Sequence, residues 1–147
     1  MKKTYALLSA LLLFSVALRA VEPEMTTEPE RLPPQARQFL NDHFPDTRVT
    51  VIRIDRESSR NASYDVILEN GAGVTFDRKG VWTGVENRYS AFPSTVLPLR
   101  ISEYLDSRFP DRKVVSIGRG KESYRVEFAD GRRVDFDMKG ELTAVER

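Results

Sequence analysis

The 147-residue chain contains no cysteine. It therefore has neither disulfides nor a lipid-modified N-terminal cysteine, although an exported compartment would tolerate disulfides. Its stability must come from packing alone. Histidine is nearly absent as well: His43 is the only one, so an enzyme that pairs a nucleophile with a histidine base has one candidate base.

Long apolar runs are lacking everywhere except at the N-terminus. There Lys2 and Lys3 precede the 14-residue run YALLSALLLFSVAL, and the small Ala20 offers a cleavage position. This layout is typical of a secretory signal peptide, and the run is shorter than the about 20 residues that a membrane span needs. We expect residues 1–20 to be a signal peptide, the mature protein to be periplasmic or secreted, and no membrane insertion after cleavage.

An excess of charge of either sign is absent too. Loss of Lys2, Lys3 and Arg19 with the signal peptide lowers the basic count from 23 to 20 against 22 acidic residues, a net charge of −2. Such a chain has no basic surface for nucleic acid, so we expect no nucleic-acid partner. Residues 21–31 are rich in Glu, Pro and Thr without apolar periodicity, which predicts a flexible leader. Residues 32–147 then form one small domain.

Internal repetition is the strongest signal that the sequence does contain. Residues 32–49 align with 97–114 at an offset of 65, and 64–86 align with 124–146 at an offset of 60. In the second alignment 11 of 23 positions are identical. The change of offset places a five-residue insertion between Ile52 and Tyr64. We interpret the domain as a tandem duplication with repeats at 32–90 and 91–147.

Each repeat is predicted to contain one helix and four strands. Ala36, Phe39 and Leu40 follow the spacing of one helical face, Pro45 ends that helix, and the second repeat has the same pattern. Residues 64–69 and 124–129 alternate between apolar and polar, which indicates half-buried antiparallel strands. The predicted fold class is α+β, with two tandem helix-plus-four-strand repeats and the helices packed on one face of antiparallel β-sheet.

Short strings of Asp, Asn, Lys and Gly separate the predicted strands. TFDRKG at 75–80 returns as DFDMKG at 135–140. This recurrence indicates either a chemical site that is present twice or a structural turn that is made twice. Asp at the first position and Gly at the last favour turns, and the exchange of Arg78 for Met138 disfavours a metal site. The Asn-Gly and Asp-Gly pairs predict two-residue type I′ hairpins. The predicted structural turn residues are Asn70, Gly71, Asp77, Gly80, Asp130, Gly131, Asp137 and Gly140.

The order of these motifs resembles a known family. Behind the signal peptide the same order of motifs occurs twice: LP, FL and HFP, followed by Y.V.L.NG..V.FD.KG.W..V. This order resembles that of the PepSY-like, putative β-lactamase-inhibitor-like proteins of the bacterial cell envelope. The resemblance covers residues 32–147 and rests on turn and core positions. It implies helices against one face of an antiparallel sheet. Inhibition of proteases or other enzymes is the activity conjectured for the family, and the contact residues of the β-lactamase inhibitor have no match here.

Residues suited to catalysis are scarce. Arg108 aligns with His43. We therefore interpret His43 as a residue at the edge of the core rather than as a base or a metal ligand. Acidic pairs stand beside basic residues, as ordinary surface charges do. We therefore expect no enzyme activity, no catalytic residue, no metal and no cofactor. Trp82 aligns with Leu142 and is expected in the core, with an exposed binding anchor as the alternative.

These exclusions leave a binding module for a protein or peptide. The sheet face away from the helices is one candidate surface, and the 55–63 loop, expected to project as a hairpin beyond its counterpart, is the other. We predict an exported non-catalytic binding module, such as an inhibitor of a protease or other envelope enzyme. The alternative is a structural or chaperone-like envelope protein that binds through exposed strand edges. Candidate partner-binding residues are Arg53, Arg56, Glu57, Arg60, Arg125, Glu127, Arg133 and Asp135.

Overall fold

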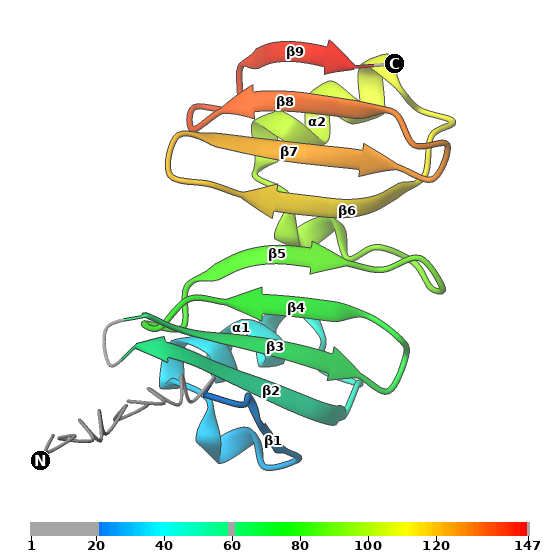
Figure 1. Ribbon diagram of the computed structural model, residues 1–147. Coiled ribbons are helices and arrows are strands. Elements are labelled where there is room, and N and C mark those ends of the chain that lie inside the picture. The colour runs from blue at the N-terminus through cyan, green and yellow to red at the C-terminus, as the bar shows by residue number, and fades with distance from the viewer. Residues whose placement is uncertain (1–20, 59–60, 147) are drawn as a thin grey trace, which may run out of the picture.

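The computed structural model describes residues 21–58 and 61–146 (Figure 1). The signal peptide expected at 1–20 lies outside the described residues. Along the chain the elements are β1 (Glu24–Thr26), η1 (Pro29–Arg31), α1 (Pro34–His43), β2 (Val49–Ser58), β3 (Asn61–Leu68), β4 (Gly73–Phe76), β5 (Trp82–Glu86), η2 (Ser94–Val96), α2 (Leu99–Arg108), β6 (Val114–Arg119), β7 (Ser123–Phe128), β8 (Arg133–Asp137) and β9 (Leu142–Glu146). No helix among these residues is long and apolar enough to cross a membrane.

The two helices begin and end where proline requires it. Pro33 and Pro98 are their N-caps, and each helix is 10 residues long. Phe44 and Phe109 end the helices with φ of −136° and −134°, because the following proline excludes the helical conformation. One stripe of each helix is buried, which confirms the helices predicted from apolar spacing.

All strands form one antiparallel sheet with the order β1 to β9, each strand pairing with the next along the chain. The predicted fold class of two tandem helix-plus-four-strand repeats is therefore wrong. The finding that overturns it is the pairing of β5 with β6, which places Val85 opposite Ile117 and makes one nine-stranded sheet, with two short α-helices in the described residues.

The physical reason is the apolar side of β5. Val85 is 1% exposed and Trp82 lies between the rings of Phe39 and Tyr124, with centroid distances of 5.8 and 6.2 Å. A separate N-terminal unit would leave this strand as an open edge with unpaired backbone groups. Pairing with β6 satisfies the backbone and continues the core, so Trp82 packs against the core as the sequence alignment predicts.

The structure also differs from the sequence prediction at residues 21–31. Instead of a flexible leader, it has strand β1, in which Met25 pairs with Arg53 of β2, and the short helix η1. Arg31 forms an ion pair with Glu24, and the adjacent Leu32 is buried in the core. Composition alone did not predict that this segment is ordered. Its order comes from backbone pairing with the edge of β2 rather than from its own side chains.

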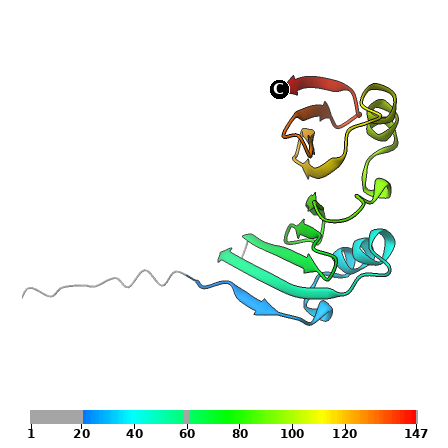
Figure 2. The same ribbon diagram turned by 90° about the vertical axis from the view of Figure 1, so that its right-hand side faces the viewer.

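The buried apolar side chains of the described residues, apart from Val115, form a single cluster with the inner stripes of the helices. Figure 2 shows α1 and α2 on the same side of the sheet. We call the opposite side, which carries no helix, the open face. The β2–β3 hairpin is longer than its counterpart, with strands of 10 and 8 residues against 6 and 6 in β6 and β7.

The hairpin turns differ from the expected type I′ geometry. Among the described residues only glycines have positive φ, whereas type I′ requires it at both central residues, so that prediction is wrong for Asn70 and Asp130. The turns at 69–71, 78–80, 129–131 and 138–140 are three-residue loops that end on a left-handed glycine. In the turn after β4, for example, Gly80 N–H donates to the Asp77 carbonyl at 3.0 Å, and Asp77 N–H donates to the carbonyl of Val81 at 2.8 Å.

Candidate functional site: the open face of the sheet

Two rows of residues cross the open face from strand to strand. Their members lie directly opposite each other on neighbouring strands and therefore share one face. The first row consists of Met25, Arg53, Asp65, Thr75, Gly84, Gly118, Arg125, Asp135 and Ala144. The second row consists of Val51, Ile67, Gly73, Glu86, Ser116, Glu127, Arg133 and Glu146.

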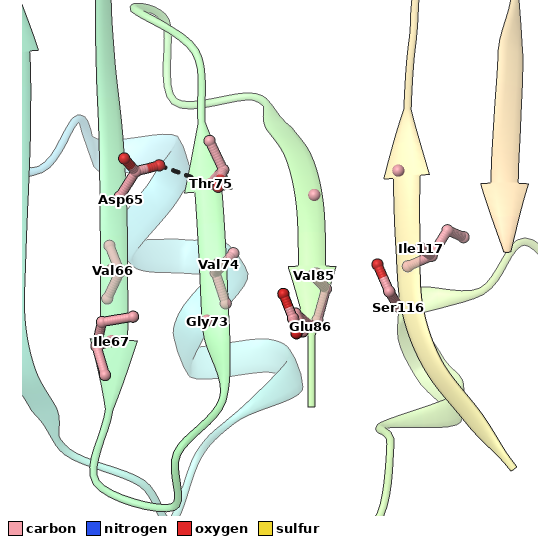
Figure 3. Close-up of a pocket in the computed structure, with 12 residues that line it drawn as sticks. Asp65, Val66, Ile67, Gly73, Val74, Thr75, Val85, Glu86, Ser116 and Ile117 are labelled. Carbon is pink, nitrogen blue, oxygen red and sulfur yellow. Dashed lines mark hydrogen bonds between the residues drawn. The ribbon is translucent and has the colours of Figure 1, made fainter. Parts of the chain in front are cut away.

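A hollow of about 300 Å³ lies in the middle of these rows, over strands β3 to β6. Gly73, Gly84 and Gly118 form its floor. Figure 3 shows its border, with the hydrogen bond between Asp65 and Thr75 on one side and the strands that carry Glu86 and Ser116 on the other. The hollow therefore occupies the place where the N-terminal and C-terminal parts of the sheet meet.

The fold does not require glycine at the floor of this hollow. None of the three floor glycines has positive φ. A Cβ on Gly118 would meet no atom within 4 Å, and a Cβ on Gly84 would approach nothing closer than 3.9 Å. Glycine in a strand interior costs about 0.5–1 kcal/mol, and it often marks a place where a ligand or another backbone approaches closely. The effect of these glycines is to keep the face hollow.

Ion pairs neutralise the C-terminal side of the open face. Arg125 donates two hydrogen bonds of 2.8 Å to the carboxylate of Asp135. Glu127 lies between Arg88 at 3.1 Å and Arg133 at 3.4 Å. The hydrogen bond from Arg125 holds the pKa of Asp135 below its ordinary value, and the hydrogen bond from Arg88 does the same to the pKa of Glu127. These charges are largely satisfied within the chain.

The N-terminal border of the hollow is different. The carboxylate of Asp65 accepts a hydrogen bond of 3.1 Å from Thr75, and within 21–58 and 61–146 it forms no ion pair. Beside it, Ile67 is 44% exposed and its Cδ1 would lie 3.7 Å from a Cβ on Gly73. An acidic group and an apolar side chain therefore stand together at one edge of a floor made of backbone.

The candidate binding residues do not form one cluster. Arg125, Glu127, Arg133 and Asp135 lie together on the C-terminal side of the open face. Arg53 belongs to the same face but lies on β2, beyond the hollow, where it donates a hydrogen bond of 3.3 Å to Asp55.

The remaining candidates belong to the β2–β3 hairpin. Arg56 points to the other side of the sheet by strand alternation and lies 3.8 Å from Glu24. Glu57 is in β2, and the placement of its side chain is not described. Arg60 lies outside the described residues. The hairpin and the open face are thus two separate surfaces.

Sequence reasoning missed the floor of the hollow and the bridging residue Arg88. Gly73 lies within β4 and Gly118 within β6. The alignment contained a usable signal, since Gly84 aligns with Ala144 and Gly118 with Arg53. Glycine thus stands within strands where the other half of the chain has a side chain.

The predicted turn residues lie at the ends of hairpins, away from the hollow. The carboxylate of Asp77 accepts backbone hydrogen bonds from Lys79 and Val81 at 2.8 and 3.0 Å, and Asp137 makes the same pair of bonds. The left-handed positions are occupied by Gly71, Gly80, Gly131 and Gly140. The carboxylates of Asp77 and Asp137 are thus occupied by backbone N–H groups of their own turns.

His43 lies at the contact between α1 and η2. Its Nδ1 is 2.8 Å from Oγ1 of Thr95, and its ring packs on Phe39 with a centroid distance of 4.4 Å. Burial lowers the pKa of His43, and the nearby Asp42 carboxylate opposes that shift. In the described part of the chain no carboxylate hydrogen-bonds the imidazole, and no three His, Asp or Glu side chains converge as a metal site would need.

Residues 62–144 match the sequence profile of the family described as "Putative beta-lactamase-inhibitor-like, PepSY-like". No curated protein shows significant similarity to this chain. Three solved structures do resemble it. One, described as a "putative periplasmic protein from DUF2874 family" of Bacteroides vulgatus, is 34% identical, with coverage of 87% of this chain and 99% of that chain and a TM-score of 0.78.

A second protein of Bacteroides vulgatus, described as a "putative periplasmic protein of unknown function", is 31% identical. The similarity covers 85% of this chain and 99% of that one, with a TM-score of 0.79. A "putative calcium-regulated periplasmic protein" of Bacteroides thetaiotaomicron is also 31% identical, with coverage of 86% and 96% and a TM-score of 0.77. All three descriptions place those proteins in the periplasm.

Proposed function

Because this chain belongs to the PepSY-like, putative β-lactamase-inhibitor-like family, we propose that it is an exported, non-catalytic module that binds a protein or peptide through the open face of its sheet. Export is supported by the signal-like sequence at 1–20 and by the periplasmic descriptions of the similar structures. Inhibition of a protease or another envelope enzyme is the form of binding that the family description suggests.

The observation that carries the proposal is the hollow floored by Gly73, Gly84 and Gly118. An exposed antiparallel sheet face is normally covered by polar side chains, which keep a partner's backbone away. Here glycines leave the backbone accessible on three adjacent strands, β4, β5 and β6. A partner can lay a side chain flat against these peptide groups and reach them at a distance that any Cβ would prevent.

The border of the hollow indicates which partner chemistry fits. Asp65 supplies a carboxylate without an ion pair in the described part of the chain, and Ile67 supplies exposed apolar surface. A basic side chain with a long aliphatic or planar stem satisfies both groups. The paired charges at Arg125 and Asp135 contribute orientation more than affinity, since they already satisfy each other.

Capture of partners from envelope extract with a matched set of variants tests this function. Gly118→Val places a side chain in the hollow, at a position where no atom lies within 4 Å of the Cβ. Ser107→Val makes a similar change at an exposed position on α2 and serves as the control. We expect one stoichiometric partner that binds the wild type and the control but not Gly118→Val. Affinities measured with that partner in purified form then give the size of the loss.

Two results would contradict the proposal. Equal binding of the partner to Gly118→Val and to the wild type would exclude the hollow as the contact surface. Capture of many unfolded proteins, independent of either substitution, would instead support the alternative of a chaperone-like protein that binds through strand edges.

A further inference from the structure

Strand β9 forms one edge of the sheet, and no strand in the described part of the chain pairs with its outer side. Figure 1 shows it at the top of the sheet, beyond β8. All five of its residues are exposed. Edge strands of native proteins are usually short, charged in the middle or covered, because unpaired N–H and C=O groups attract other strands. The central residues of β9 are uncharged.

Two apolar residues of β9 belong to the side of the sheet that carries the core. Leu142 lies opposite Phe136 and Val145 lies opposite Val134, yet they are 42% and 51% exposed. They align in sequence with Trp82 and Val85 of β5, and Val85 is only 1% exposed. The two strands have similar side chains in similar registers but very different environments.

The difference comes from the neighbouring strand. Ile117 of β6 lies opposite Val85, and Tyr124 of β7 lies over the ring of Trp82. Pairing with another strand therefore covers the core side of β5 as well as its backbone groups. Nothing in the described part of the chain does this for Leu142 and Val145 of β9.

We propose that a second copy of this chain provides the missing strand, through antiparallel pairing of β9 with β9 of the partner about a two-fold axis near Ala144. This arrangement satisfies the outer backbone groups of both strands. It also places Val145 of each copy opposite Thr143 of the other, next to Leu142, so that these apolar side chains cover one another. A two-fold interface closes on itself and gives a dimer with one continuous sheet.

The charges around β9 are compatible with self-pairing. Glu141 lies 3.6 Å from Arg100, and Glu146 lies 3.8 Å from Arg125 of the same chain. Each carboxylate near the edge is thus compensated within its own copy, so two copies do not bring uncompensated acidic groups together. The other end of the sheet fits less well, because β1 has three residues and presents Glu24 and Thr26 on the core side.

Sedimentation equilibrium tests the dimer with the full chain expressed, exported and purified from the periplasm. We expect the wild type to reach twice the monomer mass as its concentration rises. Val145→Lys should weaken dimerisation at least about tenfold, because a lysine on an edge opposes strand addition. Met25→Lys, at the opposite edge, is the matched control and should leave the mass unchanged. Circular dichroism checks that each variant remains folded.

The absence of cysteine allows a second, independent measurement. Residues that face each other in an antiparallel pair have Cα atoms about 4.5–5.5 Å apart, which is within the range of a disulfide. Ala144→Cys should therefore give a covalent dimer on mild oxidation, whereas Ser107→Cys on α2 should remain monomeric. A wild type that stays monomeric at every soluble concentration, or equal cross-linking of the two cysteine variants, would overturn the proposal. Gly118→Val should dimerise normally, which separates this interface from the open-face site.

Discussion

Gly84 of β5 and Gly118 of β6 lie directly opposite each other on the open face, at the junction between the N-terminal and C-terminal parts of the sheet. The core side of the same junction is closely filled, with Val85 opposite Ile117 and both at most 1% exposed. One pair of strands thus combines a complete core on one face with a bare backbone on the other. The contrast suggests that the glycines serve binding rather than folding.

If so, replacing Gly118 should not destabilise the protein. Gly118→Val adds a β-branched side chain in open space, and we expect the free energy of unfolding to stay equal or to rise by about 0.5–1 kcal/mol. Urea denaturation at equilibrium measures the change. A loss of stability of more than about 1 kcal/mol would mean that the glycine has a structural role and would weaken the binding argument.

Gly80 and Gly131 allow a comparison of the stability lost when a turn glycine is replaced in two different environments. Both have φ of +85°, but a Cβ on Gly80 would lie 2.9 Å from the backbone nitrogen of Ala36, whereas one on Gly131 meets nothing within 4 Å. We expect Gly131→Ala to cost about 1–2 kcal/mol from the left-handed backbone alone. Gly80→Ala should cost about 1–3 kcal/mol more, because α1 must move away. Equal losses in chemical denaturation would show that this turn does not fix the helix.

The environment of His43 predicts a dependence of stability on pH. Its pKa is lowered from 6.5 by burial, so the folded chain binds this proton more weakly than the unfolded chain. The contribution of neutral His43 to stability is fully present above pH 6.5, and it is lost as the pH falls through the folded pKa. Between these two pH values the free energy of unfolding should fall less in His43→Gln than in the wild type. NMR titration of the single imidazole gives the folded pKa directly, and a value above 6.5 would contradict this account.

His43→Ala addresses function separately. It removes the contact with Thr95 and the packing on Phe39, and we expect a modest loss of stability of about 1–2 kcal/mol. Partner binding should not change, because the open face lies on the other side of the sheet. Complete loss of a measurable activity by a folded His43→Ala protein would revive a catalytic role for this residue.

The pairing of β5 with β6 predicts that the sheet unfolds as one unit. A fragment of residues 21–90 would expose the edge of β5 and remove Tyr124 from Trp82, so we expect it to show no cooperative melting transition in calorimetry. The whole chain should give a single transition. A sharp, independent transition of the fragment would show that the N-terminal part is stable without its neighbour.

Sequence analysis found the elements whose signals are local. The apolar stripe that includes Ala36 and Leu40 predicted α1, and the alternation that starts at Tyr64 predicted β3. Asp77 and Gly80 marked a turn through their own backbone chemistry. These features depend on residues within a few positions of each other, and a sequence read in order contains them. Even here the turn type at Asn70 was wrong, because Asn and Asp tolerate more than one backbone conformation.

Tertiary structure alone decided how these elements combine. Whether β5 ends a unit or joins β6 depends on whether Val85 and Trp82 find cover from residues more than 30 positions away, and a periodic pattern does not encode that distance. The hollow arises from strand register, which sets Gly84 opposite Gly118 and Gly73 diagonally across from Gly84, although the three are scattered along the chain. Order at β1 comes from the open edge of β2 rather than from its own composition. The sequence by itself determined the local units and their turns, because those depend on short-range sterics and hydrogen bonds. The single sheet and the hollow in its open face required the three-dimensional structure, because they depend on pairing between distant strands.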